Sequence, residues 1–328
     1  ARDALSAVMG LNIYDLYYDT QNPELSYAHY FCERKTKENI YTYLLAANAT
    51  MHSNLPQGAP WNEKSYVGCT PTQNLVDAYD MKDGTEPITG YDANGQPIIN
   101  KNSGYDDKNP YENRDPRLKM TIFYHGNTFD LNGSQQALDM TDVDDKSKSS
   151  GYLVLKYLDD RIGHKSSGNS NYDCNPQMIR YAEILLSYVE ALNNLTGSHT
   201  VTFSDESTGT YTRDMNEMAK YFNMVRYRAG LPGLTTDELS SADKMFDIIV
   251  RERMIEFLHE NRRFYDVRRW GIYLDTEKEP IVGMNTDGFE DEFFQRTTVN
   301  HLFARTRVAD KKMVFLPIPR AELRKVPL

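Results

Sequence analysis

The chain has 328 residues, 40% of them hydrophobic, which is enough to bury a large core in one big domain or in two ordinary ones. Acidic residues outnumber basic residues by 47 to 37, and the resulting net charge of -10 argues against nucleic acid or an anionic membrane surface as a partner. The three cysteines lie far apart, so their spacing indicates neither a zinc site nor a disulfide framework.

The opening residues ARDALSAVMG show no initiator methionine, no signal-peptide pattern and no cysteine that could be acylated. No run in the sequence approaches the ~18 apolar residues of a membrane helix. We therefore expect either a processed chain or a fragment of a longer one. Leu5, Val8 and Met9 share one helical face before Gly10 interrupts the pattern, whereas the apolar run at residues 40–45 fits a helix and a strand equally well.

Residues 54–173 are rich in turn formers. Thr70 is a plausible cap for a short helix that has Pro71 in its first turn, and residues 84–113 form an irregular segment longer than an ordinary connection. The runs MTIFYHG (120–126) and GYLVLKYL (151–158) have the composition of strands. Long irregular segments are usually functional or disordered, so this region is the candidate for ligand binding.

After residue 173 the pattern changes to helices. Asn175 and Pro176 mark the start of the first helix, and a second is expected over residues 213–228. Ser240 or Ser241 would cap a third. The starts of these helices recur at intervals close to the ~34 residues of a helix-turn-helix repeat, which predicts stacked helical pairs.

The stretch RERMIEFLHENRRFYDVRRWG (251–271) combines apolar residues at helical spacing with charges on several faces, which predicts a buried helix whose charges need partners. Glu252, Glu256 and Glu260 recur every four residues and would form one acidic ridge. The four arginines of residues 262–269 could pair with these carboxylates through their guanidinium groups. An acid/base site is the alternative, but such a cluster more often holds helices in register. The predicted structural network consists of Arg180, Glu183, Arg226, Arg228, Glu252, Arg253, Glu256, Glu260, Arg263, Asp266, Arg269 and Trp270.

Six blocks of the sequence resemble successive signatures of the SusD/RagB family. Four lie in the helical part: IRYAEILLSYVEALNN (179–194), NMVRYRAGLP (223–232), IVRERMIEFLHENRRFYDVRRWG (249–271) and FLPIPRAEL (315–323). Two more, PTQNLVDAYDMKDG (71–84) and NRDPRLKMTIFY (113–124), are similar to the middle section of the same family. The blocks keep the family order over most of the chain.

The resemblance implies a mostly α-helical fold. Tetratricopeptide-like helical pairs would form an α-α superhelix, joined to an irregular, loop-rich region with a few short β-strands. On this basis residues 1–53 end an N-terminal helical scaffold, residues 54–173 form the candidate ligand-binding region, and residues 174–328 form the C-terminal helical region.

The resemblance also implies a non-catalytic, surface-exposed lipoprotein of the cell outer membrane. Such a protein binds an oligosaccharide or another nutrient and delivers it to a SusC-like TonB-dependent transporter. Family members begin with a signal peptide, a lipid-bearing cysteine and a helical N-terminal half, and this sequence resembles only the later part. Contact with the membrane would come only through an anchor absent from this chain. No cofactor is expected.

Trp61 is the best sequence candidate for stacking against a sugar ring, because it lies in a loop rich in Pro and Gly beside Asn62 and close to Tyr66. Tyr105, in the long irregular segment, is a further candidate for a polar aromatic rim. The alternative is that Trp61 packs against the side of the domain and that the tyrosines anchor their loops.

Catalysis and metal binding have little support in the sequence. The seven histidines show no HxxxH or HExxH spacing. The segments DANG (92–95) and DVDD (142–145) offer clustered oxygen ligands for calcium but lack the spacing of a calcium loop. Two other functions stay open. One is a helical-repeat module that binds only protein segments, and the other is a glycoside hydrolase whose carboxylates meet only in the folded chain.

Overall fold

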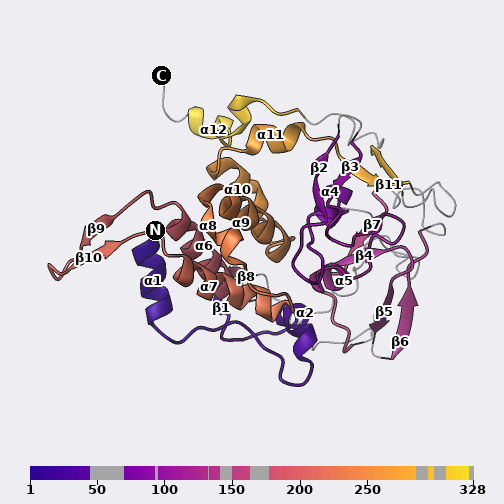
Figure 1. Cartoon of the computed structure of the whole chain (residues 1–328), viewed down its shortest axis with the longest axis horizontal. Helices are drawn as coiled ribbons and strands as arrows, with labels where there is room; N and C mark the ends of the chain where they lie inside the picture. Colours follow the sequence, from indigo (N-terminus) through magenta and orange to yellow (C-terminus); the bar gives the residue numbers. More distant parts are fainter. Residues whose placement is uncertain are drawn as a thin grey trace.

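The structure is a computed structural model that describes residues 1–44, 70–92, 95–131, 133–140, 150–162, 177–285, 295–298 and 308–324. A helical half, drawn mainly in orange, lies beside a loop-rich half drawn in purple (Figure 1). The described strands form small two-stranded sheets rather than one large sheet. The predicted fold class, mostly α-helical with an irregular region and a few short strands, is confirmed.

The helical half is built on three long helices. α6 (Tyr181–Asn193) packs against α7 (Met215–Arg228) and α9 (Ala242–Glu256), while α1 (Arg2–Gly10) lies against α6 and α8 (Thr236–Ser240) against α9. Each long helix buries one apolar face, because its apolar residues recur at helical spacing. The shared core includes Leu185, Leu186, Val189, Met218, Phe222, Val225, Met245 and Ile249.

Side chains cap α7, α8 and α9, whereas the start of α6 differs from the prediction. Ser241 caps α9 by accepting a hydrogen bond from the amide of Lys244, as expected. By contrast, α6 begins only at Tyr181, because residues 177–180 form the strand β8 (Gln177–Arg180). This strand pairs antiparallel with β1 (Asn39–Thr42), so the ambiguous run at residues 40–45 begins as a strand.

The loop-rich half contains short elements around its own core. The bounds are α4 (Gln73–Asp77), β2 (Ile88–Tyr91), β3 (Pro97–Ile99), α5 (Arg117–Thr121), β4 (Ile122–Tyr124), β5 (Thr128–Leu131), β6 (Ser134–Ala137) and β7 (Tyr152–Val154). Thr72, rather than Thr70, caps α4 by accepting from the amide of Leu75. The strand expected from residue 120 begins only at Ile122, since Met120 and Thr121 complete α5.

The remaining helices and strands lie around these two halves. They are η1 (Pro23–Leu25), α2 (Ser26–Tyr30), β9 (His199–Thr202), β10 (Thr208–Tyr211), α10 (Arg262–Arg269), α11 (Tyr273–Lys278), β11 (Val282–Met284), β12 (Arg296–Thr298), η3 (Lys311–Met313) and α12 (Arg320–Leu323). The β9–β10 hairpin projects from the helical half, and α11 and α12 lie at the upper edge of the view, above α10 (Figure 1).

A network of buried charges joins the two halves, and its centre is Glu256, the last residue of α9. The Glu256 carboxylate is fully buried and accepts hydrogen bonds from Arg117 of α5 (Nη1–Oε2, 3.0 Å), from Arg180 of β8 (Nη1–Oε1, 2.7 Å) and from Arg228 of α7. Burial alone would raise the pKa of Glu256, but the three guanidinium groups outweigh burial and hold it below its usual range. The carboxylate therefore stays ionised in the core.

The other members surround this centre. Glu260 accepts from Arg180 (Nε–Oε2, 2.7 Å) and from Lys156 (Nζ–Oε1, 2.8 Å), and Glu38 accepts from Arg180 (2.8 Å) and Arg228 (2.9 Å). Burial lowers the pKa of Lys156 to about 8, although the Glu260 carboxylate opposes this shift. We call the nine residues Glu38, Asp115, Arg117, Lys156, Arg180, Arg228, Glu252, Glu256 and Glu260 the buried charge network.

The acidic ridge is thus present, but its predicted partners are wrong. The arginines of residues 262–269 do not reach it: Arg262 forms an ion pair with Glu183 (2.8 Å), and Arg269 contacts Glu190 (Nη2–Oε2, 2.8 Å). The physical reason is the end of α9 at Glu256. Asn261 then adopts a left-handed conformation (φ 60°), so α10 does not continue the line of the ridge.

The arginine at the centre of the network should matter more for stability than the lysine at its edge. We expect Arg180→Met to lower the free energy of unfolding by about 3–5 kcal/mol, because it removes a partner from three buried carboxylates at once. Lys156→Met should cost less than half as much, since Glu260 keeps two contacts from Arg180. Urea unfolding of both variants at neutral pH measures the difference, and equal losses would contradict it.

A second prediction concerns His29, which is buried between Asp19 (Nδ1–Oδ2, 2.6 Å) and Asp160 (Nε2–Oδ1, 2.8 Å). Burial alone would lower the pKa of His29, but the two carboxylates outweigh burial and raise it. The stabilisation from protonated His29 should therefore be complete below about pH 6.5, and it should be lost as the pH rises through the raised pKa.

Urea unfolding over a pH series, with wild type and His29→Asn side by side, tests this assignment. The stability difference between the two proteins should shrink as the pH rises above about 6.5. A difference that is constant over that range would mean that His29 does not titrate as a partner of the two carboxylates.

Candidate functional site

One candidate site is a cavity of about 540 Å³ where the loop-rich half meets the helical half. Its walls come from α4, from Tyr91 in β2, from the turn of residues 257–261, from the start of α10 and from the end of α11. We call it the α4–α10 cavity. The volume lies within the roughly 300–1,000 Å³ that small-ligand sites occupy, so two or three small rings fit by size.

Three aromatic side chains line the α4–α10 cavity: Tyr91, Phe264 and Phe257, of which Phe257 is only 3% exposed. Phe264 is 41% exposed, and the Arg268 guanidinium lies 3.6 Å from its ring centroid, which covers part of the ring and orients it. Tyr91 donates a hydrogen bond from its hydroxyl to Asp77 Oδ2 (2.8 Å), and Arg296 holds Asp77 in turn (2.7 Å). The rings of Tyr91 and Phe264 are therefore fixed before any ligand arrives.

Polar groups lie beside these rings. Thr72, Asn74 and Asn261 line the cavity, as do Glu277 and Glu279 at the end of α11. Asn74 already accepts a hydrogen bond through Oδ1 from the amide of Val282 (3.2 Å), which fixes its amide group. The wall thus offers amide and carboxylate groups close to apolar surface, which is the combination that sugar hydroxyls and ring faces require.

Arg263 is the cation of this wall whose charge has the fewest partners. The described residues give it no ion pair, and its Nη1 is buried without a hydrogen-bond partner. Burial lowers the pKa of Arg263, and the more distant carboxylates of Asp266, Glu279 and Glu277 oppose this shift. The sequence placed Arg263 in the structural network, whereas the structure places it in the cavity wall.

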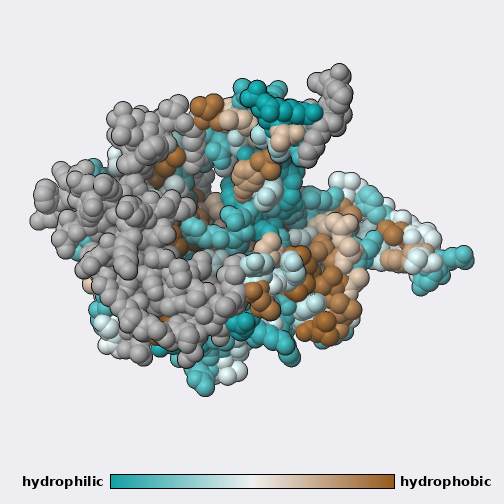
Figure 2. Space-filling view, turned by 180° about the vertical axis from the view of Figure 1, so that it is seen from behind, coloured by the Kyte–Doolittle hydropathy of each residue, from teal (hydrophilic) through white to brown (hydrophobic). Residues whose placement is uncertain are grey.

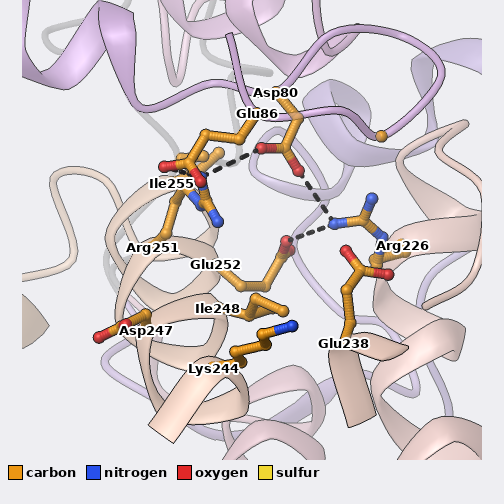
Figure 3. A pocket seen from close by; sticks show the side chains of 11 residues that line it. Asp80, Glu86, Arg226, Glu238, Lys244, Asp247, Ile248, Arg251, Glu252 and Ile255 are labelled. Atoms are coloured by element: carbon orange, nitrogen blue, oxygen red, sulfur yellow. Dashed lines mark hydrogen bonds and ion pairs between the residues drawn. The ribbon is translucent and has the colours of Figure 1, made fainter. Parts of the chain in front are cut away.

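A second, smaller cavity of about 280 Å³ is lined by charged side chains, several of which form ion pairs with one another (Figure 3). Asp80 lies between Arg226 (3.2 Å) and Arg251 (3.7 Å), and Arg226 lies 3.9 Å from Glu252. Gly84 has a φ of 85°, and a Cβ there would come within 2.7 Å of the Arg226 guanidinium. These contacts extend the buried charge network, so we assign this cavity a structural role.

Of the four residues that the sequence grouped as a ligand site, Tyr105 is the one that lies within the described residues. Trp61, Asn62 and Tyr66 lie outside the described residues. Tyr105 accepts a hydrogen bond from Arg296 Nη2 (2.8 Å), and its ring lies under the Arg114 guanidinium at 5.2 Å. Neither cavity is lined by Tyr105, which instead braces the same Arg296–Asp77 pair that orients Tyr91.

The rest of the predicted structural network forms two clusters. Arg226, Arg228, Arg180 and the three ridge glutamates belong to the buried contacts described above. A second cluster joins α6 to α9 and α10, with Arg253 bound to Asp266 (2.9 Å) and Trp270 Nε1 donating to Glu190 (2.8 Å). Glu183 pairs with Arg262, which the prediction had assigned to the acidic ridge. Arg117, Lys156 and Glu38 were also missed, since nothing local in their sequence distinguishes them.

Two further points concern the described residues as a whole: metal sites and membrane-spanning helices. No group of three His, Cys, Asp or Glu side chains in this part of the chain is placed to hold a metal ion. None of the helices described is both long enough and apolar enough to cross a membrane.

Comparison with known proteins places the fold. The profile of the SusD family matches residues 30–328. SusD-like protein P2 of Formosa agariphila is 33% identical over 110 residues, which are 31% of this chain and 19% of that protein.

Solved structures agree with this match. A SusD-like protein from Bacteroides fragilis is 26% identical, with a TM-score of 0.69 over 99% of this chain and 59% of its own. A SusD-like carbohydrate binding protein from the same species shares the fold, with 23% identity and a TM-score of 0.66 over 98% of this chain and 59% of its own. The chain thus spans less than two thirds of the length of these relatives. Because the family profile covers nearly all of the sequence and the fold agrees, this chain belongs to the SusD family.

Proposed function

We propose that this chain binds an oligosaccharide without cleaving it, and that the α4–α10 cavity forms part of the binding site. The observation that carries the proposal is the wall of that cavity, where the exposed ring of Phe264 lies near amide, guanidinium and carboxylate groups. A sugar ring has an apolar face and a rim of hydroxyls, so it needs both kinds of partner. Membership of the SusD family supports the same ligand class.

The mechanism would be capture followed by release. A micromolar to millimolar site corresponds to only about 4–8 kcal/mol, which one or two stacked rings and a few hydrogen bonds can supply. Much tighter binding would slow release to the next protein. The segment with Trp61, Asn62 and Tyr66 is proposed to extend the same binding surface.

The wider setting is also a proposal. We infer a lipoprotein at the outer surface of the outer membrane that delivers its ligand to a SusC-like TonB-dependent transporter. Family membership supports this, and so does exposed apolar surface. Tyr41 and Ile179 lie opposite each other in the β1–β8 sheet and are 60% and 40% exposed, next to Met178 at 47%. Apolar residues also gather on the helical side near the β9–β10 hairpin (Figure 2), as expected for a protein that docks on another.

One observation keeps a second candidate function in view. Glu277 and Glu279 line the same cavity, and glycoside hydrolysis needs two carboxylates on either side of the scissile bond. We favour binding, because the cavity is largely formed by fixed aromatic and apolar groups. An assay for newly released reducing ends on any glycan that binds separates the two functions.

The exposed aromatic ring of the cavity gives the direct test. Phe264→Ala should weaken glycan binding about 5- to 10-fold, since a stacked ring is worth roughly 1 kcal/mol. Tyr265→Ala is the matched control, because Tyr265 is a neighbouring exposed aromatic on the same helix that does not line the cavity. Isothermal titration against a panel of oligosaccharides measures both. Equal effects of the two substitutions would remove the cavity from the binding site.

The loop candidate is tested separately. Trp61→Ala should also lower glycan affinity about 5- to 10-fold, if the indole supplies a second stacking face. Affinity electrophoresis in gels that contain the bound glycan shows the loss as faster migration. Unchanged migration, in a variant with wild-type thermal stability, would leave Trp61 with a packing role.

A further inference from the structure

The arginines of α10 differ in how their charges are compensated. Arg262 pairs with Glu183, Arg269 with Glu190 and Asp266, and Arg268 lies over the rings of Phe264 and Tyr273 at 3.6 and 4.2 Å. Arg263 has no such partner among the described residues, and its Nη1 is buried without a hydrogen bond. It lines the α4–α10 cavity.

A guanidinium without an ion pair in a partly buried wall is costly. Buried charges in folded proteins are normally paired, because removing an ion from water costs several kcal/mol unless another charge or several hydrogen bonds replace the water. Three buried arginines of the described residues follow that rule, since Arg117, Arg180 and Arg228 each contact at least two carboxylates. The exception at Arg263 therefore calls for a partner that enters the cavity.

The backbone at the same place also favours negative charge. α10 begins at Arg262, and its N-cap residue, Asn261, supplies no side-chain hydrogen bond to the first turn. Asn261, Arg262, Arg263 and Phe264 all line the cavity, so the uncapped first turn lies at its wall. Free amides at a helix start carry partial positive charge and bind carboxylate, sulfate or phosphate groups.

We propose that the α4–α10 cavity binds a glycan that carries an anionic substituent, a carboxylate or a sulfate ester, on Arg263 and the first turn of α10. This inference rests on the proposed function and names the class of sugar. The ring of the same sugar unit would lie against Phe264, which follows Arg263 in the chain. Neutral sugars would gain the stacking contact without the ion pair.

Two carboxylates in the cavity wall limit how tightly an anion can bind. Glu277 and Glu279 line the cavity as well, and their charges repel a carboxylate or a sulfate. Removing one of these charges should strengthen the binding of an acidic glycan. For a neutral glycan the same change would replace a charged carboxylate acceptor, which binds sugar hydroxyls strongly, and should weaken binding. The sign of this effect thus distinguishes the two ligand classes.

The test uses three oligosaccharides of equal length: one with a uronate, one with a sulfate ester and one neutral. Isothermal titration is run on wild type, Arg263→Met, Glu279→Gln and Lys278→Met. Lys278 is exposed on α11 and does not line the cavity, so Lys278→Met controls for the loss of one positive charge. Circular dichroism melts of each variant check folding.

We expect Arg263→Met to weaken binding of an acidic oligosaccharide about 10-fold or more and of the neutral one less than about 2-fold, with Lys278→Met close to wild type. Glu279→Gln should strengthen acidic binding about 2- to 5-fold. Whichever acidic sugar responds, uronate or sulfate, identifies the source of the charge. The melting temperature of Arg263→Met should equal or exceed that of wild type, because no pair is broken.

Other outcomes overturn the inference in distinguishable ways. Equal losses of acidic and neutral binding in Arg263→Met would show that Arg263 serves hydroxyl groups, and the proposed function would stand without anion selectivity. A lowered melting temperature would give Arg263 a structural role instead. Failure of wild type to bind any of a wide glycan panel would remove the proposed function, and this inference with it.

Discussion

The fold depends on one buried carboxylate, Glu256, and on the three arginines that surround it. Arg117 comes from α5 in the loop-rich half, Arg180 from the strand before α6, and Arg228 from the end of α7. None of these guanidinium groups can be removed from water without a carboxylate, and Glu256 cannot stay ionised without them. The cost of leaving any one of them alone makes the four segments assemble together, and it fixes how the two halves meet.

Much of the scaffold could be predicted from the sequence, because its signals are local. Apolar spacing marks α6, α7 and α9, and Ser241 marks the start of α9. The acidic ridge could also be predicted, since four-residue spacing places side chains on one face. The partners of this ridge could not be predicted in the same way. Arg117 lies 135 residues from Glu252 in the chain, whereas the arginines of α10 are close in sequence and were the natural but wrong choice.

The candidate site could not be predicted from the sequence, for a different reason. Tyr91 lies in β2, Phe264 in α10 and Glu279 directly after α11, and each is unremarkable in its own segment. The lack of a partner at Arg263 is a property of space alone, because Arg262 beside it has the same chemistry and is paired. Loop composition directed attention to Trp61 instead, which has a strong local signal but lies outside the described residues.

The connection between α9 and α10 links the scaffold to the cavity. Within residues 256–261, Glu256 and Glu260 enter the buried charge network, while Leu258, His259 and Asn261 line the cavity. His259 and Asn261 hold left-handed φ values of 59° and 60°, a conformation that costs a non-glycine residue free energy and persists only where the surroundings enforce it. Here the enforcing contacts are the ion pairs of the two glutamates. A wall fixed in this way loses little conformational entropy when a ligand binds, so even a few weak contacts can give useful affinity. The charges that hold the two halves together therefore also preorganise the surface that we propose for recognition.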